Sequence, residues 1–290
     1  MSQYSDNKFD TQQYDDARPT YPKEFYEVIL SKVNHRELAV DLGCGTGIVT
    51  YAIAPYFTMT IGTDPSEAMI RQCKRKLVDN VEFLQGTGEQ FPAEIAPGSV
   101  DLITAGECAH WFNHEAFFKE CHRMLKPGGT LAFWLYKDPV FEDPRANAIY
   151  RKYTWESSFD HNTGADFEQY MGPYYQQPGH NYLGSLLKEK PVPSELYTDI
   201  ERVEYLLDDR QRPTRLQSTP LRIKKNVSVQ WFLEYVKSWS AYHSWMKDHG
   251  DKYDVAEAFT KELMSAMGWT LDTPITLDFE TMYTTAHKKP

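Results

Sequence analysis

The segment VDLGCGTGIVT, residues 40–50, holds the residues whose types and spacing point most directly to chemistry. Its three glycines, Gly43, Gly45 and Gly47, follow an apolar run that contains one acid, Asp41. Glycine readily adopts positive φ and lets a ligand approach the backbone where a Cβ would block it. A strand that ends in such a loop and opens into a helix is typical of a nucleotide-binding turn.

The glycine spacing separates two classes of nucleotide. Dinucleotide-binding loops carry G-x-G-x-x-G, whereas here the third glycine comes one residue early. This disfavours an NAD-dependent oxidoreductase, which stays an alternative together with a catalytically silent cofactor-binding scaffold. S-adenosylmethionine has no phosphate, and it needs close backbone contact and an acid for its ribose hydroxyls. We expect Asp64, at the end of the next strand, to be that acid or to cap the following helix.

Two further loops follow predicted strands. In QGTGEQFP (85–92), the residues Gly86, Thr87 and Gly88 are expected to pass close to an adenine. In AGECAHWF (105–112), His110 and Trp111 stand where a transferred methyl group would leave the cofactor. The alternative for His110 is a hydrogen-bonded core histidine.

The elements that must position these loops alternate regularly. Strands are predicted at 37–43, 58–64, 81–86, 99–106 and 130–136, and helices at 22–33, 46–57, 64–77 and 114–129. Such alternation indicates parallel β-α units with right-handed connections, and therefore a doubly wound α/β sheet. Ligands of these sheets bind at the carboxyl ends of the strands.

The alternation stops near residue 137. Residues 138–226 are rich in proline, tyrosine and charge, and we interpret them as an α/β insertion over the active site. Helices are expected at 228–247 and near 253–267, and a last strand at 275–289. We expect one domain over 1–290: an N-terminal arm and helix (1–33), a cofactor-binding core (34–137), the insertion (138–226), and C-terminal helices with the last strand (227–290).

Composition excludes several functional classes. The 290 residues carry a formal charge of −10, which argues against nucleic acid as a partner. Four cysteines without C-x-x-C or metal-site spacing indicate a reduced, intracellular protein without a metal. The polar N-terminus lacks the apolar stretch of a signal peptide, and no run nears the roughly 18 apolar residues of a membrane span. We expect a cytoplasmic monomer or homodimer.

One group of charges contrasts with this acidic chain. Its members lie between residues 210 and 225 and are Arg210, Arg212, Arg215, Arg222, Lys224 and Lys225. They form either a solvated face or a cationic wall for an anionic small-molecule substrate.

Four segments, VDLGCGTG, GTDPSEAMI, VEFLQGTGEQFP and LKPGGTLAFW, resemble the class I S-adenosylmethionine-dependent methyltransferases in order and spacing. This likeness covers about residues 14–136. A narrower resemblance, to the fungal trans-aconitate methyltransferases, rests on YDDARPTYP, ECAHWF, GPYYQQPG and WSAYHSW. That family pattern has Arg after QPG, where this chain has His180, so the substrate differs if the Arg binds a substrate carboxylate.

The resemblance implies a seven-stranded Rossmann-like sheet and S-adenosylmethionine as cofactor, with S-adenosylhomocysteine as product. The implied reaction is O-methylation of a small molecule, forming a monomethyl ester on a polycarboxylate such as trans-aconitate; the alternative acceptor is a toxin or secondary metabolite. A carboxylate acceptor needs no general base, whereas a phenol, alcohol or amine would use His110.

The resemblance and the strand ends together assign site residues. Those expected to bind the cofactor are Tyr14, Arg18, Asp41, Gly43, Cys44, Gly45, Gly47, Asp64, Pro65, Met69, Gly86, Thr87, Gly88, Glu89, Ala105, Gly106 and Glu107. Those expected to bind substrate are Tyr21, His110, Trp134, Tyr174, His180, Lys224, Tyr242 and Tyr283. His110 and Trp111 are the candidates for catalysis. Two alternatives remain: Asp41 is an acid satisfied within the protein, and Tyr242 is part of a core stripe with Trp239 and Trp245.

Overall fold

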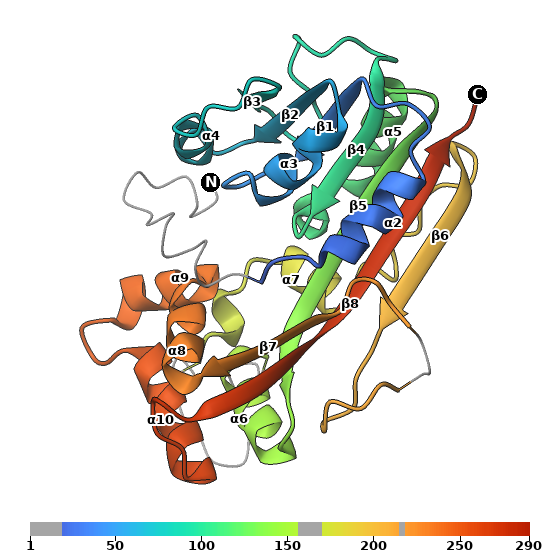
Figure 1. Cartoon of the computed structure of the whole chain (residues 1–290). Coiled ribbons are helices and arrows are strands. Elements are labelled where there is room, and N and C mark those ends of the chain that lie inside the picture. The colour runs from blue at the N-terminus through green and yellow to red at the C-terminus, as the bar shows by residue number, and fades with distance from the viewer. Residues whose placement is uncertain (1–18, 156–169, 215–217) are drawn as a thin grey trace.

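The structure is a computed structural model that describes residues 19–155, 170–214 and 218–290. Within these ranges, eight strands form one sheet (Figure 1). The strands are β1 (Leu38–Leu42), β2 (Met59–Asp64), β3 (Val81–Gln85), β4 (Val100–Gly106), β5 (Leu125–Phe141), β6 (Tyr197–Tyr205), β7 (Ile223–Ser228) and β8 (Pro274–Lys288).

The strand order is β3-β2-β1-β4-β5-β8-β6, and β7 pairs with β8 off this path. Neighbours from β3 to β5 are parallel, whereas β8 runs antiparallel to β5, β6 and β7. The path of seven strands is the predicted doubly wound sheet, and it confirms the fold class. It also brings the carboxyl ends of β1, β2 and β4 to one edge, where the loops lie.

Helices cover both faces of the sheet. They are α2 (Lys23–Ser31), α3 (Ile48–Ile53), α4 (Glu67–Cys73), α5 (His114–Met124), α6 (Pro144–Thr154), α7 (Gly179–Gly184), α8 (Val229–Lys237), α9 (Ser240–His249) and α10 (Val255–Met267), with short 3₁₀ turns at η2 (Ala54–Tyr56), η3 (Ala109–Trp111) and η5 (Gly172–Tyr174). Figure 1 shows α2 and α3 in front of the sheet and α5 behind it. No helix in the described ranges has both the length and the apolar character that crossing a membrane requires.

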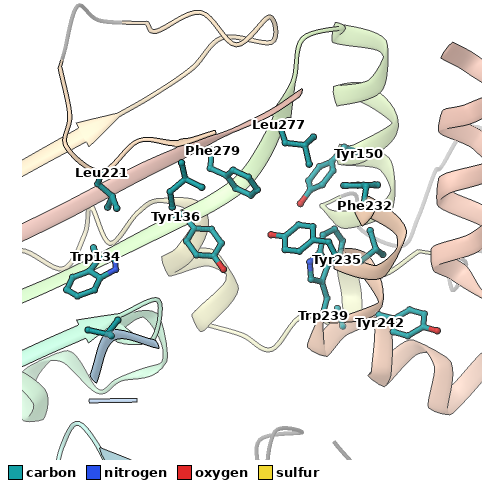
Figure 2. Close-up of a cluster of buried hydrophobic side chains, with 14 of the residues drawn as sticks. Trp134, Tyr136, Tyr150, Leu221, Phe232, Tyr235, Trp239, Tyr242, Leu277 and Phe279 are labelled. Carbon is teal, nitrogen blue, oxygen red and sulfur yellow. The ribbon is translucent and has the colours of Figure 1, made fainter. Parts of the chain in front are cut away.

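Two large apolar cores result from this arrangement among the described residues, beside a small cluster of Cys44, Ile70, Cys73 and Phe83. One core packs Phe117 and Phe118 of α5 against β1, β4 and β5. The other runs from α2 along β5 and β8 into the helices α6, α8 and α10. Figure 2 shows the middle of this second core, where aromatic rings of β5, α6, α8 and β8 meet.

The long strands β5 and β8 make the second core possible. The sequence predicts β5 only over 130–136, but it continues to Phe141, and β7 pairs with the first residues of β8. Phe141 and Phe279 of this extension pack against α8 through Phe232 and Tyr235. The helical layer thus stands beyond the parallel part of the sheet.

Other elements also differ from expectation; α3 and α4, for example, are shorter than the predicted helices 46–57 and 64–77. The predicted helix 228–247 is two helices, because the Ser238 hydroxyl donates to the Tyr235 carbonyl (2.6 Å) and Trp239 is extended. The predicted helix 114–129 ends at Met124, and residues 125–129 join β5. Residues 197–205, within the segment interpreted as an insertion, form β6 at the edge of the main sheet.

Candidate active site

The glycine loop connects β1 to α3 through three left-handed residues. The φ angles are 58° at Gly43, 54° at Gly45 and 90° at Gly47. A Cβ at Gly43 would lie 2.7 Å from Cys108, whereas a Cβ at Gly45 would meet no atom within 4 Å. The middle of the loop therefore faces open space, as a loop that cradles a ligand must.

Asp64 ties this loop to the end of β2. Its carboxylate accepts the amide N–H of Gly45 at 3.0 Å and that of Ser66 at 2.8 Å. Burial raises its pKa, and the two amide bonds act in the opposite direction. Ser66, not Asp64, is the N-cap of α4. Because a carboxylate accepts about four hydrogen bonds, Asp64 keeps capacity for two ribose hydroxyls.

Asp41 is satisfied inside the protein. Its two carboxylate oxygens accept the hydroxyls of Thr50 and Thr104, both at 2.7 Å. Burial raises the pKa of Asp41 to about 6 despite these bonds. Among the described residues, the contacts of Asp41 thus agree with the alternative that it is an acid satisfied within the protein.

A pocket of about 490 Å³ lies beside Asp64, after β2 and β3. It is lined by Pro65, Gln85, Gly86, Thr87, Gln90, Phe91, Pro92 and Ala93. The Thr87 hydroxyl accepts the amides of Glu89 (3.3 Å) and Gln90 (3.1 Å), which closes the turn. The pocket is where the predicted adenine loop should present its backbone.

Other residues predicted to bind the cofactor contact the neighbouring loops or are buried. The Glu89 carboxylate accepts the Asn113 amide at 2.8 Å, and Gly88 packs against Phe112. Cys44 and Met69 are buried. Tyr14 and Arg18 lie outside the described residues.

Beyond β4, the chain turns sharply at Glu107. This residue has a φ of 56°, which is uncommon for a residue with a side chain. Its amide donates to the Trp134 carbonyl (2.9 Å), and its carboxylate accepts the Tyr136 amide (2.7 Å). The side chain therefore continues the β4–β5 ladder past Ala105 and Gly106, and it fixes β5 at Tyr136, beside the expected methyl exit.

Trp134 and Tyr21 stand at this exit. The indole of Trp134 lies over Gly106, since a Cβ there would be 2.8 Å from the ring. Its Nε1–H is buried and has no hydrogen-bond partner among the described residues. Tyr21 meets the same indole edge-on at 5.4 Å. Burial and the nearby Tyr136 and Glu107 hold the pKa of Tyr21 well above its usual value.

His110 and Trp111 form η3 just after the exit. His110 is buried, whereas 41% of Trp111 is exposed, and the two rings lie 4.5 Å apart. Helix α7 docks on this turn through Gly179, where a Cβ would come within 2.5 Å of the Trp111 ring. The segment 179–184 thus packs beside His110 and Trp111, the residues expected at the methyl exit.

The next residue, His180, is clamped between two aromatic rings. Its imidazole stacks on Trp155 at 3.9 Å and on Tyr175 at 4.0 Å between ring centroids. The Asp138 carboxylate of β5 holds Trp155 through the indole N–H and also accepts the Tyr150 hydroxyl. Sequence reasoning missed Trp155 and Asp138, because they belong to no motif, and it did not single out Tyr175 within GPYYQQPG; only packing brings the three together.

Of four further predicted substrate residues, only Tyr283, the β8 partner of Trp134, lies beside the expected exit. The Tyr174 hydroxyl is 2.6 Å from Nε2 of His249, and the Tyr242 hydroxyl donates to Asp254 at 2.9 Å. Tyr283 is buried against Phe25 of α2. Tyr242 is buried with Trp239 and Trp245, in agreement with the core stripe.

Lys224, the fourth, is exposed on β7 opposite Asp278. Asp278 is five residues along β8 from Tyr283, the partner of Trp134, which corresponds to roughly 17 Å. In the basic group, Arg212 pairs with Asp208 and Arg222 with Asp278. Arg215 is outside the described residues. The described residues of this group therefore form no continuous wall at the exit.

The doubly wound sheet, its antiparallel β8 and the glycine loop that Asp64 anchors define a Rossmann-like methyltransferase fold. A family model described as "Methyltransferase domain" matches residues 40–133. A solved structure from Anaeromyxobacter dehalogenans, named a candidate type II methyltransferase, is similar in fold, with a TM-score of 0.67 at 23% identity over 94% of this chain and 99% of that one.

Two relatives extend the match over the whole chain. A probable S-adenosylmethionine-dependent methyltransferase of Saccharomyces cerevisiae is 32% identical over 99% of this chain and 98% of its own. A candidate methyltransferase of Dictyostelium discoideum is 30% identical over 90% and 86%. The chain therefore belongs to the S-adenosylmethionine-dependent methyltransferases, and the NAD-dependent oxidoreductase alternative falls.

The site fits the cofactor of this family. The open face of Gly45, the remaining acceptor capacity of Asp64 and the pocket at Gly86 and Thr87 suit a methionine portion, a ribose and an adenine in turn. When bound, S-adenosylmethionine supplies an electrophilic methyl group on its sulfonium.

Proposed function

We propose that this methyltransferase acts on a carboxylate oxygen of a small organic acid and forms a methyl ester. A polycarboxylate such as trans-aconitate, which the sequence resemblance suggests, is the first acceptor to test. The proposal depends on the chemistry of the groups at the methyl exit, above all on Trp134 and Tyr21.

The observation that carries the proposal is a pair of neutral donors at the exit. The Trp134 N–H is buried without a hydrogen bond of normal geometry among the described residues, although it interacts with the Tyr21 hydroxyl, which the raised pKa keeps protonated. An indole N–H and a phenol donate hydrogen bonds to an anionic oxygen, but neither accepts a proton at neutral pH. They suit an acceptor that arrives ionised, because a carboxylate needs no general base.

These residues would work by positioning. The acceptor oxygen has to lie about 3 Å from the methyl carbon and opposite the sulfur, and fixing that geometry supplies much of the acceleration. Trp134 is held over Gly106 by the β4–β5 ladder, which Glu107 continues. A rigid donor so close to the exit can hold one carboxylate oxygen while the other is methylated.

A second candidate is an acid of lower charge than trans-aconitate, such as a secondary metabolite or toxin. The specific observation in its favour is the pairing of Arg212 and Arg222 with acids, together with the distance of Lys224 from Trp134. The described acceptor side is aromatic and hydroxyl-rich around Trp134, Trp155 and Tyr175.

The test is to incubate the protein with S-adenosylmethionine and a panel of acceptors: trans-aconitate, simple mono- and dicarboxylic acids, a phenol and an amine. Mass spectrometry should find a base-labile product one methylene heavier, formed from an acid. Trp134→Phe removes the donor together with one ring of the buried indole, and we expect KM for that acid to rise about tenfold while the cofactor Kd stays unchanged. Trp269→Phe, a change in a tryptophan that packs on Phe141, serves as the matched control. Turnover of only the phenol or the amine would overturn the carboxylate assignment.

A further inference from the structure

The stack of Trp155, His180 and Tyr175 holds a buried imidazole between two aromatic rings. His180 is 6% exposed, and its Nε2 has no hydrogen-bond partner among the described residues. Burying a polar nitrogen without a partner costs free energy, so such atoms usually have one. A ligand atom that reaches Nε2 would remove this cost.

The two flanking rings hold the imidazole rigidly. The planes of His180 and Tyr175 are 12° apart, and those of His180 and Trp155 are 25° apart. Trp155 is fixed in turn by Asp138, and the His180 amide donates to the Gln176 carbonyl at 3.1 Å. An imidazole clamped on both faces can turn only its edge to a ligand, which fixes the direction of a hydrogen bond.

The stack also lies in the acceptor half of the molecule. Gly179, next to His180, touches Trp111 and approaches the His110 carbonyl. Asp138, which holds Trp155, follows Trp134 and Tyr136 along β5. The stack is therefore connected to the methyl exit through η3 on one side and through β5 on the other.

We propose that His180 is the residue that selects the acceptor: its Nε2 binds an uncharged polar group, a hydroxyl or carbonyl, at the end of the organic acid remote from the carboxylate that is methylated. This inference rests on the proposed function. Binding of such a group by His180 would make hydroxy or oxo acids better acceptors than dicarboxylic acids of equal length.

The charge state of His180 supports the choice of an uncharged group. Burial lowers the pKa of His180 to about 4, so the imidazole is neutral at neutral pH. A neutral imidazole has one donor and one acceptor nitrogen. It can bond a hydroxyl or a carbonyl, but it brings no positive charge to offset the desolvation of a second carboxylate.

The experiment compares three series of acids, each four to eight carbons long: unsubstituted acids, ω-hydroxy acids and α,ω-dicarboxylic acids. For the wild type, we expect kcat/KM at the best length to be at least tenfold higher for the hydroxy acid than for either counterpart. His180→Phe keeps a flat ring in the stack and removes both nitrogens. It should abolish that preference and leave the unsubstituted acids within about twofold.

His114→Phe is the matched control. His114, the first residue of α5, is also buried with an unpartnered Nε2 in the described part of the chain, but its ring meets Tyr182 of α7 edge-on. We expect this variant to keep the wild-type preference. Calorimetry with S-adenosylhomocysteine-saturated protein measures binding of the hydroxy acids without turnover, and His180→Phe should weaken it at least tenfold.

The outcomes separate the two proposals. If acids are methylated but His180→Phe lowers kcat/KM for all three series equally, or the dicarboxylic acids are preferred, the selection by His180 is overturned and ester formation stands. If the wild type binds and methylates no acid, both proposals fail together.

Discussion

The cofactor half and the acceptor half of this methyltransferase are built in different ways. In the cofactor half, Asp64 accepts two backbone amides, from Gly45 and Ser66, and all three residues lie within about 20 positions of one another. In the acceptor half, Tyr21, Trp134, Trp155 and His180 come from four segments that span most of the first 180 residues. One half depends on the backbone of loops, the other on side chains brought together by packing.

This difference explains where specificity can change. The glycine loop tolerates little sequence variation, because its glycines adopt positive φ. The Asp64 carboxylate likewise depends on backbone amides held in fixed positions. An aromatic surface assembled from distant segments can change one ring at a time without disturbing the sheet. The cofactor half is therefore suited to one ligand across a family, and the acceptor half to many.

The largest expected effect comes from removing the anchor of the cofactor half. Asp64→Ala leaves the amides of Gly45 and Ser66 without their acceptor and removes the candidate ribose ligand, so we expect the Kd for S-adenosylmethionine to rise more than a hundredfold. Calorimetric titration measures this.

Asp101→Ala is the control for Asp64→Ala. The Asp101 carboxylate likewise accepts two backbone amides, of Glu37 and Leu38, but at the opposite end of β1. We expect a loss of stability with an unchanged cofactor Kd. Equal affinities for wild type and Asp64→Ala would contradict the ribose assignment.

The second effect concerns the buried acid beside the loop. The pKa of Asp41 is raised from 3.8 to about 6, so the folded protein binds a proton at Asp41 more tightly than the unfolded chain does. Its contribution to stability is complete below pH 4 and is lost as the pH rises through 6; the loss amounts to about 3 kcal/mol. Asp41→Asn, neutral at every pH, should therefore gain stability relative to the wild type between pH 4 and pH 7.

Urea unfolding of both proteins across this pH range measures that difference. A constant difference in unfolding free energy would show that Asp41 has an ordinary pKa in the folded protein. The result would also show how much stability the cofactor half loses by holding an acid without a cationic partner.

The smallest effect sharpens the role of the loop backbone. In Gly45→Ala, the new Cβ points into the open space that the cofactor would occupy, and we expect roughly a tenfold weaker Kd. Gly98→Ala is matched, because Gly98 also has a positive φ (67°) and no atom within 4 Å of a Cβ. Both variants should lose about 1 kcal/mol of stability. Similar cofactor affinities in the two would refute the cradle.

The sequence located the glycine loop and the acid at the end of β2 because their signals are local. Gly43, Gly45 and Gly47 mark a turn that few other residues can form, and Asp64 ends a strand whose neighbour is fixed by the alternation of strands and helices. The boundary errors also have local causes: the Ser238 hydroxyl breaks a helical pattern that the apolar spacing alone would continue. Lys224 shows what sequence patterns do not reveal. Its charge suggested a substrate contact, but the register of β7 on β8 places it far from Trp134.

The amino-acid sequence by itself thus determined the parallel part of the sheet, the glycine loop, the family and the acid at the end of β2, because each depends on neighbours within one β-α unit. Only the tertiary structure decided that Trp134 covers Gly106, that Glu107 holds Tyr136, and that Trp155 and Tyr175 clamp His180. The reason is physical: these contacts are made by side chains of residues far apart in the chain, and their distances and directions exist only once β5, β8 and the helices have packed.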